Sequence, residues 1–209
     1  MKMNKRGYFI TLEGSEGSGK STQARWLIQT LRRRGHKVVF VRDPGSTALG
    51  RALRRVLLHS TAPLSAMEEA LLFIGGRVQL VEEKIVPALK AGKVVICDRF
   101  HDSTIVYQGY AGGLDVTWLD QLGRKAIQGV MPDLTIVLDI PVKQGFARLR
   151  RSHDRMESKA RIFHQRVRAG FRKFARLNRR RMVVIDAGKP ARVVHGQIEK
   201  AVLGRLHRN

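Results

Sequence analysis

The sequence has 209 residues, enough for one domain with a substantial hydrophobic core and too few for two domains of ordinary size. Hydrophobic residues make up 43% and charged residues 27%, which excludes a wholly disordered chain, and no apolar run approaches the roughly 18 residues of a membrane span. Forty Lys and Arg against 17 Asp and Glu give a net charge of +23; residues 141–209 contribute +16 of it, from 20 basic and 4 acidic residues.

This charge predicts that the protein attracts anions. Two interpretations stay open: a solvated, Arg-rich surface on a protein that binds small anions, or a surface that binds a nucleic acid or another acidic partner. The single cysteine, Cys97, cannot form an internal disulfide. Glu13 interrupts the apolar run that follows the basic Met1–Arg6 start, which argues against a signal peptide. We therefore expect a cytoplasmic protein that does not bind membranes.

Five short runs rich in β-branched and apolar residues are predicted to be strands. They lie at residues 8–13, 37–42, 93–98, 134–139 and 181–186. Each run is apolar throughout rather than alternating, as expected for a parallel sheet buried on both faces. Helix-like segments separate the runs, so we predict an α/β fold with a five-stranded parallel sheet flanked by helices.

A phosphate-binding motif directly follows the first predicted strand. It fits G-x-x-x-x-G-K-[ST] at every fixed position and opens a helical pattern, which is the context that this motif requires. The glycines let successive backbone N–H groups turn toward a phosphate, and the helix N-terminus adds partial positive charge. We predict that Lys20 bridges the β- and γ-phosphates and that Ser21 holds Mg²⁺. The predicted phosphate-binding residues are Gly14, Ser15, Glu16, Gly17, Ser18, Gly19, Lys20, Ser21 and Thr22.

Residues 66–86 are predicted to form one long helix. Phe73 and Arg77 share a face that lies away from its apolar stripe, where a ring and a guanidinium could bind a nucleobase; packing of Phe73 into a second core is the alternative. Gly75 and Gly76 are costly in a helix and indicate close approach by another backbone or by a ligand. The predicted buried stripe consists of Met67, Leu71, Ile74, Val78, Val81 and Ile85.

The third predicted strand ends at a second group of polar residues. Asp98 is placed to hold Mg²⁺ through water, and Arg99 offers a planar fork for a phosphate. Arg54, on the helix after the second strand, can direct another cation to the same place. A cluster suited to hydrogen bonds with a sugar and a base follows: Ser103, Tyr107 and Gln108.

Together these motifs resemble the bacterial type of thymidylate kinases, which are P-loop nucleoside monophosphate kinases. The resemblance covers nearly the whole chain. It is carried by the P-loop, R-D-P-G-S-T, F-I-G-G-R-V-Q-L, D-R-F, S-T-I-V-Y-Q-G, P-D-L-T-I-V-L-D and D-R-M-E. It implies a three-layer P-loop kinase fold in one domain over residues 1–209, with a lid at about 147–158. It further implies ATP- and Mg²⁺-dependent phosphorylation of dTMP to dTDP in dTTP synthesis, by a homodimer formed through helices beside the sheet.

The resemblance also implies site roles. Phe73 would stack on thymine, Arg77 would bind its edge, and Tyr107 would disfavour a ribose 2′-hydroxyl. Gly17 occupies the position where another group of the family has a catalytic arginine, so the lid would supply one instead; which lid arginine acts stays open. The implied dTMP-binding residues are Glu16, Arg54, Phe73, Arg77, Arg99, Ser103, Tyr107 and Gln108. The implied catalytic residues are Lys20, Arg99, Arg150 and Arg155, and the implied metal-binding residues are Ser21 and Asp98.

Several positions depart from the family pattern, so two alternatives are kept. Asp43, Ser46 and Arg51 replace the usual Glu, Gly and Glu, and the lid before Asp154 looks shorter than is typical. One alternative is a kinase for another pyrimidine nucleotide or a deoxynucleoside. The other is a P-loop protein repurposed to bind nucleic acid through its basic segment. The aromatic residues of that segment have the spacing of a helix core stripe, which speaks against stacking on bases; they are Phe163, Phe171 and Phe174.

Overall fold

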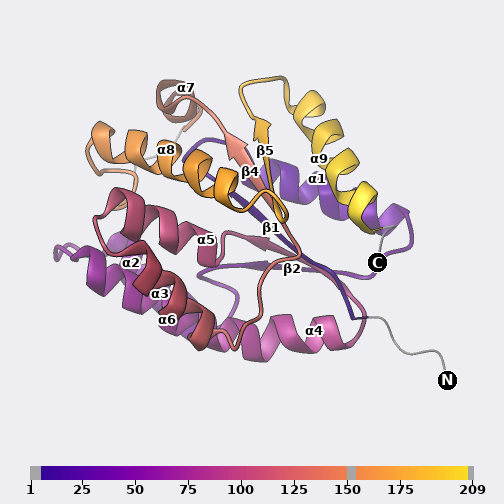
Figure 1. The fold of residues 1–209 in the computed structure, drawn as a ribbon, viewed down its shortest axis with the longest axis horizontal. Coiled ribbons are helices and arrows are strands. Elements are labelled where there is room, and N and C mark those ends of the chain that lie inside the picture. Colours follow the sequence, from indigo (N-terminus) through magenta and orange to yellow (C-terminus); the bar gives the residue numbers. More distant parts are fainter. Residues whose placement is uncertain (1–5, 150–153, 207–209) are drawn as a thin grey trace.

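A computed structural model describes residues 6–149 and 154–206 and contains one parallel sheet with the strand order β2-β3-β1-β4-β5 (Figure 1). Each strand agrees with a predicted run to within one residue, so the predicted five-stranded parallel sheet is confirmed. The strands are β1 (Phe9–Gly14), β2 (Val38–Arg42), β3 (Val94–Asp98), β4 (Leu134–Asp139) and β5 (Met182–Asp186).

Helices connect the strands and cover both faces of the sheet. Two of them, η1 and η2, are short π-helices that continue α3 and α5 without a break. The described helices are α1 (Lys20–Arg33), α2 (Ala48–His59), α3 (Ala66–Leu80), η1 (Val81–Ile85), α4 (Val86–Lys90), α5 (His101–Thr104), η2 (Ile105–Ala111), α6 (Val116–Ala126), α7 (Val142–Ala147), α8 (Arg161–Leu177) and α9 (Ala191–Leu206).

Successive residues of β1 point to opposite faces of the sheet, which builds a core on each side. Ile10 packs with Leu27 of α1 and Ile198 of α9, and Figure 1 shows these two helices side by side on one face. Phe9 packs on the other face, in a cluster with Ile85 and Leu89. The sheet therefore lies between two helical layers, as the three-layer prediction required.

The predicted buried stripe of residues 66–86 is wrong in its first half. Met67 and Leu71 are 39% and 51% exposed, whereas Ile74, Val81 and Ile85 are buried. Met67 and Leu71 both precede η1, so the fault lies within α3 itself. The buried face of α3 carries the polar Glu69 and Arg77, so apolar spacing alone does not identify it.

The two glycines of α3 differ in their surroundings. A Cβ atom on Gly76 would lie 3.0 Å from Leu53 Cδ1, and the backbone of Gly50 passes 3.9 Å from the same point. A Cβ atom on Gly75 would meet nothing within 4 Å. The predicted close approach is therefore confirmed for Gly76, where α2 packs on α3, and is wrong for Gly75.

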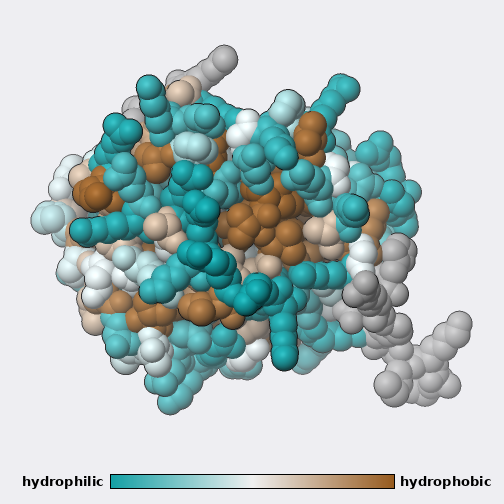
Figure 2. All heavy atoms as spheres, turned by 45° about the horizontal axis from the view of Figure 1, so that its top comes forward, coloured by the Kyte–Doolittle hydropathy of each residue, from teal (hydrophilic) through white to brown (hydrophobic). Residues whose placement is uncertain are grey.

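The positive charge of the chain lies on its surface. Figure 2 shows a mostly hydrophilic face with a smaller apolar area near its centre. Phe171 and Phe174 of α8 are buried and Phe163 is partly buried, which confirms the predicted core stripe. None of the helices in the described ranges is long and apolar enough to cross a bilayer. The cations that α8 exposes are Arg161, Arg166, Arg172, Lys173 and Arg176.

Substitution of the two α3 glycines should change stability in opposite directions. Gly75→Ala should raise the free energy of unfolding by about 0.5–1 kcal/mol, because alanine is the better helix former and its methyl group enters open space. Gly76→Val should lower it by about 1–3 kcal/mol, because the branched side chain overpacks the contact with Leu53. Urea unfolding of both variants measures the difference; equal effects would contradict the packing described.

Candidate active site

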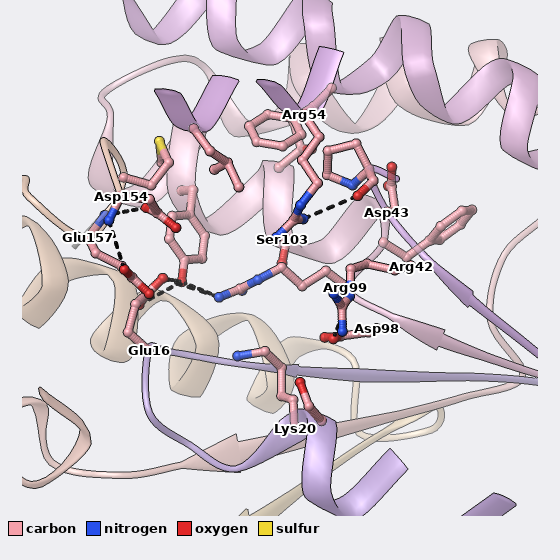
Figure 3. Close-up of a pocket in the computed structure, with 18 of the residues that line it drawn as sticks. Glu16, Lys20, Arg42, Asp43, Arg54, Asp98, Arg99, Ser103, Asp154 and Glu157 are labelled. Carbon is pink, nitrogen blue, oxygen red and sulfur yellow. Dashed lines mark hydrogen bonds and ion pairs between the residues drawn. The ribbon is translucent and has the colours of Figure 1, made fainter. Parts of the chain in front are cut away.

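A cavity of about 520 Å³ lies at the carboxyl ends of β1, β2 and β3 (Figure 3), within the size range of small-molecule sites. Every residue predicted to bind the acceptor lines it: Glu16, Arg54, Phe73, Arg77, Arg99, Ser103, Tyr107 and Gln108. Lys20, Ser21, Thr22 and Asp98 line the same cavity, so the structure joins the phosphate-binding loop to the predicted acceptor residues.

The phosphate-binding loop wraps around the ammonium group of Lys20. Nζ donates to the carbonyl oxygens of Gly14 and Ser15, both at 3.0 Å, and to Ser18 Oγ at 3.3 Å. Burial lowers the pKa of Lys20 to about 8, and the neighbouring Arg99 acts in the same direction. The hydrogen-bond acceptors of this ammonium are all neutral, so an arriving phosphate would stabilise its charged form.

Two glycines bring the phosphate-binding loop against α7. A Cβ atom on Gly17, whose φ is +65°, would lie 1.9 Å from the carbonyl oxygen of Gly145. A Cβ atom on Gly145 would lie 2.4 Å from the carbonyl oxygen of Glu16. Any side chain at residue 17 would therefore strike backbone, which agrees with the prediction that a catalytic arginine has to come from elsewhere.

Glu16 is the centre of a buried polar network within the loop. Its carboxylate accepts from Tyr107 Oη at 2.7 and 2.9 Å and from Arg99 Nη2 at 3.2 Å. His164 Nδ1 of α8 lies 3.7 Å from Oε2, an ion-pair contact rather than a hydrogen bond. Burial alone would raise the pKa of Glu16, but His164, Arg99 and Lys20 together lower it to about 2. Glu16 is therefore an anion that fixes Arg99 and the tyrosine hydroxyl.

Arg99 adopts a left-handed backbone conformation, with φ of +65°, which is uncommon for a residue with a side chain. Its Nη1 donates to the Gly14 carbonyl oxygen at 3.0 Å and to Ser103 Oγ at 3.2 Å. The guanidinium also lies over the Tyr107 ring, 4.9 Å from its centroid. These contacts hold the planar fork at the junction between the loop and the acceptor residues.

The Arg77 guanidinium is held by two hydrogen-bond acceptors, and one of its NH₂ groups makes no hydrogen bond to the described residues. Its Nε donates to Asp43 Oδ2 and its Nη2 donates to Thr104 Oγ1 at 2.9 Å. The side chain is only 1% exposed, and no group in the described part of the chain accepts from Nη1. Asp43, one of the departures from the family pattern, thus still anchors the arginine predicted to bind the base.

The oxygen donors of the cavity fit Mg²⁺. The Ser21 hydroxyl and the Asp98 carboxylate line the same wall as Lys20, and Asp98 Oδ2 also accepts from Arg42 Nε at 3.2 Å. Residues 6–149 and 154–206 contain no group of three or more His, Cys, Asp or Glu that could enclose a metal ion. Such a sparse set suits Mg²⁺, which keeps waters and uses one or two protein oxygens with the substrate phosphates.

Only one of the two predicted lid arginines, Arg155, can be placed in the structure. Arg150 lies outside the described residues. Arg155 does not line the cavity; its Nη1 donates to Glu69 Oε1 at 2.8 Å and its Nε donates to the Leu57 carbonyl oxygen at 2.8 Å. Contact of Arg155 with a transferred phosphate would therefore require it to leave Glu69, and its catalytic role stays a prediction.

Several residues that line or support the cavity could not be identified as site residues from the sequence. Asp154 and Glu157 line the cavity on either side of Arg155, and the D-R-M-E motif was the only sequence signal for them. His164 and Glu69 carry no local motif. The partners of Glu69 lie 39 to 90 residues away, and His164 contacts Glu16, 148 residues before it, besides the nearby Glu157 carbonyl oxygen. Glu13 accepts from the Phe100 backbone N–H at 2.8 Å and from Ser103 Oγ at 2.6 Å. Its position at the end of the first strand was the only signal.

Comparisons with known proteins agree with this geometry. The family model described as thymidylate kinase matches residues 12–198. A thymidylate kinase of Synechococcus sp. (strain JA-2-3B'a(2-13)) is 47% identical over 186 residues, covering 88% of this chain and 89% of that protein. One of Desulfovibrio desulfuricans is 44% identical over 210 residues, covering 96% and 97%. The crystal structure of thymidylate kinase from Ehrlichia chaffeensis is 36% identical with a TM-score of 0.78, covering 94% and 99%.

Burial of Glu13 should make stability fall as the pH rises. Desolvation, reinforced by the charge of Asp102, raises the pKa of Glu13 to about 8 from its usual 4.5. Between these values the folded protein binds more protons than the unfolded chain, so the contribution is complete below pH 4.5 and is lost as the pH rises to about 8. Glu13→Gln, which imitates the protonated carboxyl group, should remove this part of the pH dependence.

Urea unfolding at pH 5, 7 and 9 measures the effect. Relative to Glu13→Gln, the wild type should lose at least about 1 kcal/mol of unfolding free energy between pH 5 and 9. Glu83→Gln, at an exposed position on η1, is the matched control and should follow the wild type. Parallel pH curves for the wild type and Glu13→Gln would rule out a protonated Glu13.

Proposed function

This chain belongs to the thymidylate kinase family, and we infer that it phosphorylates dTMP to dTDP with ATP as the phosphate donor. The observation that carries this inference is the single cavity in which a phosphate-binding loop and all eight expected acceptor residues meet. A P-loop alone identifies only a nucleoside triphosphate site. The acceptor residues indicate which second substrate is phosphorylated.

The reaction needs alignment and charge neutralisation rather than a general base. The nucleophile is an oxygen of the dTMP phosphate, which is already ionised at neutral pH, so we propose that the protein brings it in line with the γ-phosphate of ATP. Lys20 neutralises charge on the ATP phosphates. Arg54 and Arg99 hold the dTMP phosphate, and the anionic Glu16 keeps the Arg99 guanidinium in place.

The sugar and base are proposed to bind deeper in the cavity. Phe73 stacks on thymine, and the unused Nη1 of Arg77 donates to a thymine carbonyl oxygen. Tyr107, whose hydroxyl is held by Glu16 and Arg99, closes the space beside the sugar and disfavours a 2′-hydroxyl. Without a ligand acceptor, Arg77 Nη1 is a buried donor that makes no hydrogen bond to the described residues. A base whose carbonyl oxygen accepts from it therefore binds preferentially.

Ser21 and Asp98 are the residues proposed to hold Mg²⁺ against the ATP phosphates. When bound, the ion neutralises negative charge that develops during phosphoryl transfer. We also propose that the protein acts in the cytoplasm, which is consistent with the unpaired, buried Cys97.

Steady-state kinetics with a series of acceptors tests the proposed function. ADP release should require Mg²⁺ and should be fastest with dTMP among the nucleoside monophosphates. No turnover with any acceptor, from protein that still binds ATP, would favour the alternative of a P-loop repurposed to bind nucleic acid. Preference for a different acceptor would replace dTMP in the proposal and leave the kinase assignment standing.

Arg77→Ala extends the same experiment to the base site. The variant should lose at least about tenfold in kcat/KM for dTMP, because a buried hydrogen bond to the base is lost. The KM for ATP should hardly change, because the hydrogen-bond partners of Arg77, Asp43 and Thr104, lie outside the P-loop. Equal losses for both substrates would reject the role of Arg77 in base binding.

A homodimer through α2 and α3 is proposed from the exposed apolar residues of these helices. Leu49 and Val56 lie seven residues apart on α2, and Met67 and Leu71 lie four apart on α3; each is at least 39% exposed. These spacings place each pair on one helix face. Since α2 packs on α3, the four side chains offer an apolar surface to a second copy.

Light scattering after size exclusion should give twice the mass of one chain. Leu71→Asp should shift the protein toward the monomer, because it buries a charge in the proposed interface. Leu177→Asp replaces another exposed leucine, on α8, and should leave the mass unchanged. A monomeric wild type would contradict the proposed dimer.

A further inference from the structure

Glu69 of α3 is a buried carboxylate with no contact to the phosphate-binding loop. Its side chain is 1% exposed and receives three donors from two parts of the chain, η2 and residues 155–159. Oε1 accepts from Arg155 Nη1 at 2.8 Å and from Lys159 Nζ at 2.7 Å. Oε2 accepts from Gln108 Nε2 at 2.9 Å. The two oxygens thus serve different purposes: one binds cations, and the other holds the amide of a cavity residue.

The contact with Glu69 fixes the orientation of the Gln108 amide. A carboxylate flanked by two cations is an acceptor only, so the amide must present its NH₂ group to Glu69. The amide oxygen, Oε1, is then the atom that remains for a ligand, and no donor in the described ranges binds it. Gln108 is 1% exposed and lines the cavity, so its polarity is a fixed property of the site.

Arg77 supplies the complementary group in the same cavity. Its Nη1 is a buried donor without an acceptor in the described ranges, because Asp43 and Thr104 occupy the other nitrogens. The cavity therefore includes a fixed donor, from Arg77, and a fixed acceptor, from Gln108, for the base. Thymine and uracil present an N3–H donor beside carbonyl acceptors. Cytosine presents an N3 acceptor beside an amino donor, the reverse pattern.

We propose that Glu69 determines base specificity by positioning the Gln108 side chain. It holds the Gln108 amide so that the amide oxygen accepts a hydrogen bond from the N3–H of the base, and cytosine is therefore rejected. The proposal rests on the proposed function, because it concerns the acceptor base of that same site. Glu69 acts through Gln108 and touches no substrate. A cytosine in this place would face an acceptor with an acceptor, at the cost of an unpaired buried group.

Glu69→Gln tests the proposal with a side chain of the same shape. A glutamine at residue 69 can donate to Gln108 Oε1, which releases the Gln108 amide to turn its NH₂ group toward the base. The ratio of kcat/KM for dTMP to that for dCMP should fall at least tenfold, through loss with dTMP and gain with dCMP. The KM for ATP should stay within about twofold, since a loss of fold or of the P-loop would move it too.

Two further variants separate amide orientation from simple stabilisation. Lys159→Met removes one donor from Oε1 and leaves the Oε2 contact, so it should lower the melting temperature and keep the dTMP to dCMP ratio. In a Gln108→Met background, Glu69→Gln should have no further effect on the ratio, as a double-mutant cycle requires of a residue that acts through Gln108. If Glu69→Gln does not fold, Gln108→Met alone carries the test and should reduce the same ratio at least tenfold.

An unchanged ratio in a folded Glu69→Gln variant would overturn the proposal. So would an equal loss in Lys159→Met, or a full effect of Glu69→Gln without the Gln108 amide. These outcomes differ from failure of the proposed function, which would appear in the wild type itself as absence of a preference for dTMP.

Discussion

The site depends on the pairing of buried and half-buried arginines with buried carboxylates. Unpaired, either partner would be a charge removed from water, and loss of one member of such a pair typically costs about 3–5 kcal/mol. The pairs around the cavity are Arg77 with Asp43, Arg99 with Glu16 and Arg155 with Glu69. Seven of the 17 acidic residues are buried, most of them around this site. Much of the negative charge therefore lies in the interior, and the surface carries the excess of cations.

Contacts to buried carboxylates also connect the turn at residues 154–157 and helix α8 to the cavity. His164 reaches the carboxylate of Glu16 with one ring nitrogen and contacts the Glu157 carbonyl oxygen with the other, at 3.2 Å. Glu69 joins Arg155 and Lys159 to the Gln108 amide, which lines the cavity. Residues 154–164 therefore support the cavity at two places, through Glu16 and through Gln108.

Local sequence patterns could predict the strands and the P-loop, because each depends on a few neighbouring residues, whereas the full set of acceptor residues was implied by the resemblance to a family. Continuous β-branched runs predict buried parallel strands, and the glycine spacing of residues 14–22 predicts a phosphate site wherever it follows one. The burial of Met67 and Leu71 was predicted wrongly, because the buried face of α3 carries the polar Glu69 and Arg77, which apolar spacing does not reveal. Glu69 and His164 could not be found because tertiary contacts alone give them their partners.

The contact between Gly17 and Gly145 limits how this protein can evolve. An arginine at residue 17 would place its Cβ 1.9 Å from the Gly145 carbonyl oxygen. This single substitution would disrupt the loop before the new side chain could contribute to the reaction. The backbone of α7 would have to move first, so a P-loop arginine is separated from the present sequence by a change in backbone rather than by one codon.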